Sequence, residues 1–122
     1  MKRVERNPED FLPLTEAMFH ILLALADRER HGYHIMQEVD ERTEGKVRLG
    51  PGTLYGSIKR MLSDGLVEET DERPDPEMDD ERRRYYRLTD FGYRVATAQA
   101  QRLERLVKSA RTKKLLSKTQ AS

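Results

Sequence analysis

The stretch LGPGTLYGSIKRMLSDGLV, residues 49–67, predicts a short helix with two chemically different faces. Gly50-Pro51 marks its start, because proline at the first helical position loses no hydrogen bond that the helix would have made. Gly65 marks its end. Four apolar side chains share one face, which we expect to pack in the core: Leu54, Ile58, Met61 and Leu62. The opposite face holds small polar groups, a glycine and a guanidinium: Thr53, Gly56, Ser57 and Arg60. Such a face either is simply solvated or lies close to a polar partner such as the DNA major groove.

Two further helices are predicted before this stretch. Thr15 is a suitable N-cap for a helix that runs through Ala26. Its wide apolar face belongs in the core: Leu14, Met18, Ile21, Leu22 and Leu25. A second helix follows His31-Gly32 and ends near residues 43–45, with Ile35, Met36 and Val39 on its apolar side. Residues 46–49 then alternate polar and apolar, which predicts a very short strand.

A β-hairpin is predicted after Gly65. Its strands are residues 66–70 and 85–88, and the acidic loop 71–81, with Pro74 and Pro76, joins them. Three helices that lead directly into such a hairpin have the order of a winged helix-turn-helix. The expected fold class is therefore mainly α with a small β-hairpin (α+β): a winged helix-turn-helix with a long C-terminal dimerisation helix.

The last predicted helix begins at the cap Thr89 and runs to Leu116, about 27 residues or roughly 40 Å at 1.5 Å per residue. A seam of 4-3-4-3 spacing, typical of helix pairing, runs along it: Ala96, Ala100, Leu103, Val107 and Ala110, with Leu106 beside them. A second copy of the chain is the simplest partner for this seam. We expect an N-terminal arm (1–13), a winged helix-turn-helix DNA-binding domain (14–88), a C-terminal dimerisation helix (89–116) and a tail (117–122).

The composition of the 122 residues excludes several classes of function. The net charge is only +1, but residues 68–81 hold nine acids and one base, whereas residues 94–122 hold eight bases and one acid. The absence of cysteine excludes thiol catalysis, disulfides and thiolate metal sites, and suits a reducing cytoplasm. The longest apolar run, residues 21–26, is too short to span a bilayer. We expect a soluble cytoplasmic protein that does not engage a membrane.

Catalytic and metal sites are not expected. His31 and His34 have no third histidine or any cysteine in a matching pattern, so we interpret them as marking a helix start. The acids gather in a charged loop where nothing fixes or desolvates a pair, and no nucleophile with a base, phosphate loop or dinucleotide motif is present. We therefore expect no enzyme activity, no metal and no cofactor.

Two candidate DNA contacts have alternative interpretations. Tyr55 lies at the edge of the apolar stripe, where its ring is either half buried, with the hydroxyl on a surface partner, or available to a phosphate. Residues 82–84 are three arginines directly after the acidic loop. They either neutralise Asp79, Asp80 and Glu81 or bring the wing to the minor groove or its phosphates.

Three phrases resemble the PadR family of transcriptional repressors, in the family's order and spacing across residues 14–92. They are HGYHI (31–35), GTLY (52–55) with Lys59-Arg60 and Gly65-Leu66-Val67, and RYYRLTDFG (84–92). The resemblance implies a homodimeric winged-helix DNA-binding protein, with the third helix in the major groove, the wing at its flank and the last helix contacting the partner subunit. The single C-terminal helix is similar to the small branch of the family.

The chain departs from the family pattern at two places. Gly56 stands where the family commonly has proline or alanine, which loosens the helix by roughly 0.5–1 kcal/mol relative to alanine. The wing is longer and more acidic than a minimal family wing, so its tip should be repelled by phosphate. Some small members bind planar aromatic drugs between tryptophans. This chain has no tryptophan, so an effector here would need a pocket lined by other, aliphatic residues.

From the residues and the resemblance together, we expect a repressor that binds a pseudo-palindromic operator as a homodimer. The expected DNA contacts are Thr53, Tyr55, Ser57, Lys59, Arg60, Arg82, Arg83 and Arg84. The expected dimer contacts are Ala96, Ala100, Leu103, Leu106, Val107 and Ala110. The alternative is a protein-interaction module that kept the winged helix and the dimer but lost DNA binding, with the acidic wing serving a basic partner.

Overall fold

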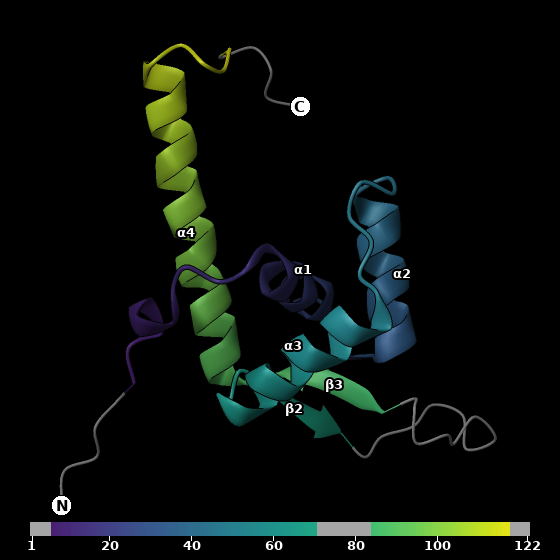
Figure 1. Cartoon of the computed structure of the whole chain (residues 1–122). Coiled ribbons are helices and arrows are strands. Elements are labelled where there is room, and N and C mark those ends of the chain that lie inside the picture. Colours follow the sequence, from purple (N-terminus) through teal and green to yellow (C-terminus); the bar gives the residue numbers. More distant parts are fainter. Residues whose placement is uncertain (1–5, 71–83, 118–122) are drawn as a thin grey trace, which may run out of the picture.

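Four α-helices and a small antiparallel sheet make up the computed structural model, which describes residues 6–70 and 84–117 (Figure 1). The elements in chain order are the 3-10 helix η1 (Pro8–Phe11), α1 (Glu16–Leu25), β1 (Arg30–His31), α2 (Gly32–Arg42), α3 (Pro51–Ser63), β2 (Val67–Thr70), β3 (Tyr85–Leu88) and α4 (Asp90–Thr112). The sheet has the order β1-β3-β2. This arrangement is a winged helix-turn-helix followed by a long helix, and it confirms the predicted fold class.

The helix starts follow from local capping chemistry. The Thr15 hydroxyl accepts a hydrogen bond from the Met18 amide at 3.1 Å, and the Thr89 hydroxyl accepts one from the Gly92 amide at 2.9 Å. These bonds satisfy amides that have no partner within the first turn. Helix α3 begins with Pro51, as predicted, and the chain leaves it through Gly65, whose φ of +74° favours glycine.

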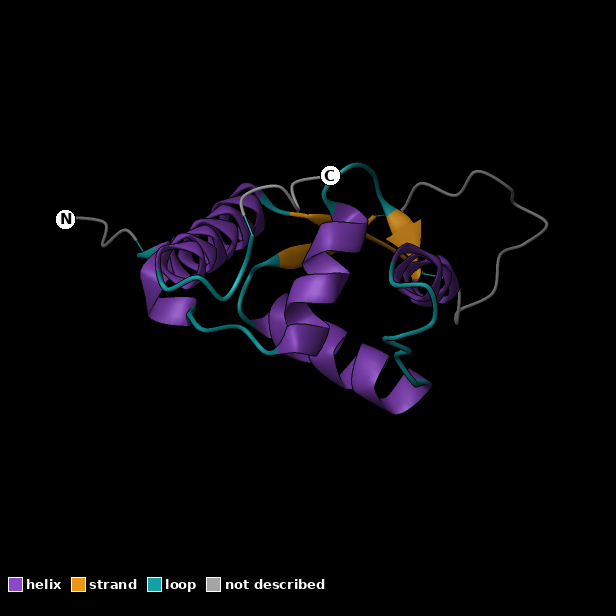
Figure 2. Ribbon diagram, turned by 90° about the horizontal axis from the view of Figure 1, so that it is seen from above, coloured by secondary structure: helices purple, strands orange, loops and turns teal. Residues whose placement is uncertain are grey.

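Helix α1 lies at the centre of the molecule and contacts α2, α3, α4 and β3. Figure 2 shows α2 and α4 nearly end-on, on opposite sides of α1 and α3. Every residue of the predicted apolar face of α1 is buried, and so are the inner side chains of the elements around it. These inner residues include Ile35, Val39, Leu54, Ile58, Met61, Leu66, Tyr86 and Val95. Within the described ranges, no helix is both long and apolar enough to cross a membrane.

The strand predicted at residues 46–49 is wrong. Those residues form no strand, and the Val47 amide donates to the Thr43 hydroxyl at 3.0 Å instead of to a neighbouring strand. The place beside β3 is taken by β1, where Arg30 pairs with Tyr86 and His31 with Tyr85. A strand of two residues is too short to show an alternation of polar and apolar side chains, so β1 is defined only by its pairing with β3.

The predicted end of the last helix is also wrong, because α4 ends at Thr112 and not at Leu116. Lys114 has a φ of +66°, and the Leu115 amide turns back to donate to the Ala110 carbonyl at 2.8 Å. This closure satisfies a carbonyl that the last turn would leave without a partner. The helix therefore has 23 residues.

The wing strands β2 and β3 pair in antiparallel register, with Glu68 opposite Arg87 and Glu69 opposite Tyr86. Arg87 pairs with Glu68 at 2.8 Å, and Arg84 pairs with Glu69 at 3.1 Å. These exposed pairs join the base of the wing across its two strands. The acidic loop 71–81 lies outside the described residues.

The end of α3, the start of β2 and the start of α4 meet at one point, which we call the α3–α4 joint: residues 64–66 with residues 89–92. The Thr89 amide donates to the Leu66 carbonyl at 3.1 Å, and the Thr89 hydroxyl donates to the Gly65 carbonyl at 2.6 Å. Gly92 packs so closely that a β-carbon there would collide with the Leu66 carbonyl oxygen. Only glycine allows α4 to lie against this backbone.

Replacing Gly92 by Ala should therefore lower the free energy of unfolding by about 3 kcal/mol or more, because backbone stands on both sides of the contact and cannot yield as a flexible side chain would. Gly56→Ala in α3 is the matched control, since a β-carbon there meets nothing within 4 Å. Alanine at position 56 should instead raise stability by roughly 0.5–1 kcal/mol. Urea unfolding of both variants measures the difference, and equal stabilities would contradict the packing described at Gly92.

Candidate nucleic-acid interface

Helix α3 has the two faces that its sequence predicts. Leu54, Ile58 and Met61 are buried, and Leu62 is half-buried. On the other side Thr53, Gly56, Lys59 and Arg60 are exposed and Ser57 is half-buried. Because a β-carbon at Gly56 would have open space around it, the helix backbone can be approached closely there. The arrangement is a rigidly backed helix whose outer face offers hydroxyls and cations within reach of a polar partner.

Arg60 lies in the last turn of α3, at the end of this face that is next to the N-terminal arm. It lines an open hollow of about 400 Å³ together with Asp64 and residues 10–15, Asp10 among them. Thr53 is seven residues earlier, roughly 10 Å along the helix axis at 1.5 Å per residue. The hydroxyls of the first turns and the guanidinium of the last turn are therefore separated along the helix, and Asp10 and Asp64 line the same hollow as Arg60.

Tyr55 packs against α2. Its ring and hydroxyl lie against Gly32, where a β-carbon would collide with the hydroxyl oxygen, and 38% of the residue is exposed. The hydroxyl is therefore directed at α2, while the residue as a whole remains exposed. The glycine of the HGYHI phrase is thus needed for the contact between α2 and α3.

His31 begins α2. Its Nδ1 accepts a hydrogen bond from the His34 amide at 3.2 Å, and its ring stacks on the His34 ring with centroids 3.7 Å apart. The ring is buried and meets Tyr85 of β3 edge-on at 5.3 Å. The helix-start interpretation of this histidine is confirmed. Its second role, tying α2 to the wing strand, was missed because it depends on the β1–β3 pairing.

At the base of the wing, the structure describes one of the three predicted arginines. Arg84 is exposed and pairs with Glu69, whereas Arg82 and Arg83 lie outside the described residues. The neighbouring Tyr86 is a core side chain, and burial, followed by the charge of Glu69, raises the pKa of its phenol. At the base of the wing, the positive charge of Arg84 is therefore partly neutralised by the carboxylate of Glu69 on the adjacent strand.

Helix α4 extends well beyond the winged-helix domain (Figure 1). Along its predicted seam, Leu103, Leu106 and Val107 are exposed by 39%, 58% and 37%, and Ala100 is exposed. Ala96 and Ala110 are half-buried. An apolar stripe of this kind on a projecting helix is typical of a surface that meets another helix.

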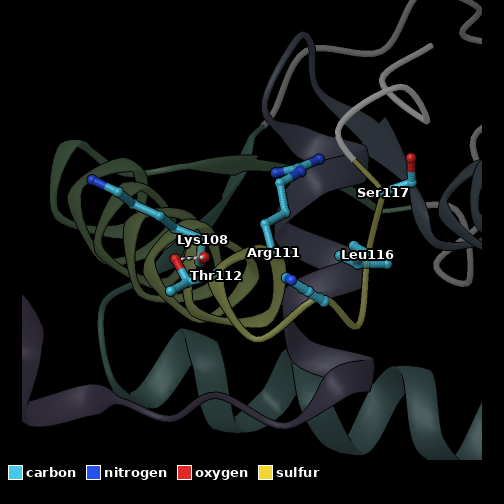
Figure 3. A pocket seen from close by; sticks show the side chains of 6 residues that line it. Lys108, Arg111, Thr112, Leu116 and Ser117 are labelled. Atoms are coloured by element: carbon cyan, nitrogen blue, oxygen red, sulfur yellow. Dashed lines mark hydrogen bonds between the residues drawn. The ribbon is translucent and has the colours of Figure 1, made fainter.

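The far end of α4 is basic. Lys108, Arg111 and Lys114 line an open hollow of about 640 Å³ with Leu116 and Ser117, and the Thr112 hydroxyl donates to the Lys108 carbonyl at 3.2 Å (Figure 3). Cations at a helix C-terminus complement the partial negative charge of its free carbonyls. The cluster therefore stabilises the last turn of α4.

The N-terminal arm contributes residues that sequence reasoning missed. The Asn7 side chain accepts a hydrogen bond from the Glu9 amide at 3.0 Å and so caps η1, which packs on α4. The Asn7-Pro8 pair is a local signal that could have predicted this turn. Its partner surface on α4 could not have been predicted from neighbouring residues.

Known proteins resemble this chain both in sequence and in fold. A model of the transcriptional regulator PadR-like family matches residues 21–98. The transcriptional regulator Rv3488 of Mycobacterium tuberculosis is 36% identical over 89 residues, which cover 73% of this chain and 77% of that protein.

Solved structures agree with the family match. A PadR family transcription regulator from Clostridium difficile R20291 superimposes with a TM-score of 0.65 and 26% identity, over 79% of this chain and 95% of that one. RosR of H. salinarum superimposes with a TM-score of 0.60 and 27% identity, over 82% of this chain and 80% of that one. The chain therefore belongs to the PadR-like family of transcriptional regulators, which are not enzymes.

Proposed function

We propose that this protein is a repressor that binds a pseudo-palindromic operator as a homodimer, with one α3 helix in the major groove at each half-site. The observation that carries the proposal is the outer face of α3, where an exposed and a half-buried hydroxyl, two exposed cations and an open glycine lie on a helix whose other face is buried. A regulator of this kind acts on the chromosome, so we place it in the cytoplasm.

The geometry of helix-turn-helix proteins supports an assignment of roles along α3. In that class the N-terminal residues of the recognition helix contact base edges. Thr53 and Ser57 would take this role here, whereas Lys59 and Arg60 would meet phosphates or an outlying base. Tyr55 would support α3 through its contact with α2. From the wing, the arginine run that ends at Arg84 would approach the flank of the site.

Arg60→Ala should weaken operator binding by about 1–3 kcal/mol and leave the fold intact, because the side chain is exposed. The loss falls on one base pair if Arg60 reads a base. It is uniform, with a shallower salt dependence, if Arg60 pairs with phosphate. Titration of operator variants at several salt concentrations measures both.

Arg105→Ala is the matched control, since it removes the same charge from an exposed position on α4 away from the predicted seam. Equal affinities for the two variants and the parent would remove Arg60 from the interface. If the parent itself lacks salt-sensitive binding to DNA at low salt, the protein-interaction alternative is favoured, because groove binders retain nonspecific affinity.

The homodimer is proposed from α4. The exposed Leu103, Leu106 and Val107 form an apolar stripe between small residues, which permits close approach of a second helix. Each would bury apolar surface worth about 25 cal/mol per Å² on pairing. The projecting helix leaves this stripe available to a second copy of the chain, and two linked domains would match the two halves of a palindrome.

Leu103→Asp should give a folded monomer, because it would place an unpaired carboxylate in the pairing contact while lying outside the winged-helix core. Operator affinity should fall by roughly two to four orders of magnitude, since separate domains lack the effective concentration of a dimer. Sedimentation and operator titration measure the two effects. Leu115→Asp, at an exposed leucine beyond the helix end, is the control and should remain dimeric. A dimeric Leu103→Asp would place the interface elsewhere.

A further inference from the structure

The N-terminal arm closes the α3–α4 joint from outside. The Arg6 guanidinium donates from Nη1 to the Asp64 carbonyl at 2.6 Å, and Asp64 is the C-cap of α3. The same guanidinium lies over the ring of Phe91 in the first turn of α4, with its central carbon 4.0 Å from the ring centroid. One side chain therefore holds the end of α3 and the start of α4 at once.

Two aromatic rings reinforce this contact. Phe11 of η1 meets Phe91 edge-on with centroids 5.3 Å apart, and Arg6 lies 5.5 Å from the Phe11 centroid. Cation–π and edge-to-face contacts are both favourable, and they strengthen when the groups are partly desolvated. Both phenylalanines pack against the edge of the core.

Leu14, the residue directly after the arm, contacts α4 two turns further along. The Leu14 amide donates to the side-chain carbonyl oxygen of the buried Gln99 at 3.4 Å. The arm thus contacts α4 near residue 91 and α3 at its C-cap, and Leu14 at the end of the arm contacts α4 near residue 99. Contacts at two heights on one helix resist tilting, whereas a single contact would act as a pivot.

We propose that Arg6 is a positioning residue that fixes the angle between α3 and α4 and thereby sets the half-site spacing that the dimer accepts. The inference rests on the proposed function. Leu103, in the middle of the predicted seam, is about 20 Å from the start of α4 at 1.5 Å per residue. A tilt of about 10° at the joint would move it by roughly 3.4 Å, which is the rise of one base pair. A modest loosening of the joint would therefore change the register of the two half-sites.

Operators in which the distance between half-sites is varied one base pair at a time provide the functional test. The parent should prefer one spacing. Arg6→Ala, which removes both the hydrogen bond and the stacked cation, should reduce this preference by about tenfold while leaving half-site affinity unchanged. Arg6→Lys keeps a cationic donor and should restore part of the preference. Arg28→Ala, at an exposed arginine before β1, should behave as the parent. An unchanged spacing preference in Arg6→Ala would overturn the inference.

A second measurement needs no DNA. The chain has no cysteine, so Ser63→Cys at the end of α3 and Arg105→Cys on α4 can carry the only two spin labels. Labelled protein diluted with unlabelled protein reports the distance within one chain. Arg6→Ala should broaden the distribution of that distance while a thermal melt shows that the domain stays folded. An identical distribution in parent and variant would overturn the inference. Failure of the parent to bind DNA would instead contradict only the proposed function.

Discussion

The contact between Gly92 and the Leu66 carbonyl is the constraint on which the arrangement of the elements depends. It brings the first turn of α4 against the backbone that leaves α3 and enters the wing. The Thr89 amide donates to the Leu66 carbonyl and its hydroxyl to the Gly65 carbonyl, while the same hydroxyl accepts from the Gly92 amide, so Thr89 bonds to both sides of this contact. Helix α3, the wing strand β2 and α4 therefore meet at this one joint, and their relative orientation is set there.

Local chemistry explains how much of the fold could be predicted. The helical periodicity, the capping residues and the turn residues were sufficient to predict α1, α2, α3 and the paired strands. Thr15, Pro51, Gly65 and Thr89 each act on the backbone within a few residues of themselves, so their effect can be read locally. One error occurred where a distant segment decides the outcome, and the other where a single residue takes an unusual backbone conformation. The strand beside β3 is Arg30–His31 and not residues 46–49, because pairing with Tyr85 and Tyr86 defines it. The early end of α4 depends on the left-handed backbone conformation of Lys114. Lysine is not a residue type that indicates such a conformation, so the helix end could not be predicted from it.

The candidate site divides in the same way. The exposure of Thr53, Lys59 and Arg60 follows from the helical period and could be predicted from the sequence. The surroundings of Arg60 could not, since they come from the arm and place Asp10 beside the same hollow. The packing of Tyr55 on Gly32 likewise joins α3 to α2, a contact that the periodicity of neither helix specifies. These tertiary contacts hold α3 against α2 and against the segment 10–15, and they leave the outer face of the helix exposed.

We propose that a dimer presents two such faces to one duplex, and selection from a random pool of DNA with the purified full chain tests this arrangement. We expect enrichment of a pseudo-palindromic motif whose half-site centres are about one helical turn apart, roughly 10–10.5 base pairs, or a multiple of that distance. Enrichment of a single unpaired half-site would contradict the dimeric arrangement. A pool that stays unenriched at low salt would contradict DNA recognition by α3.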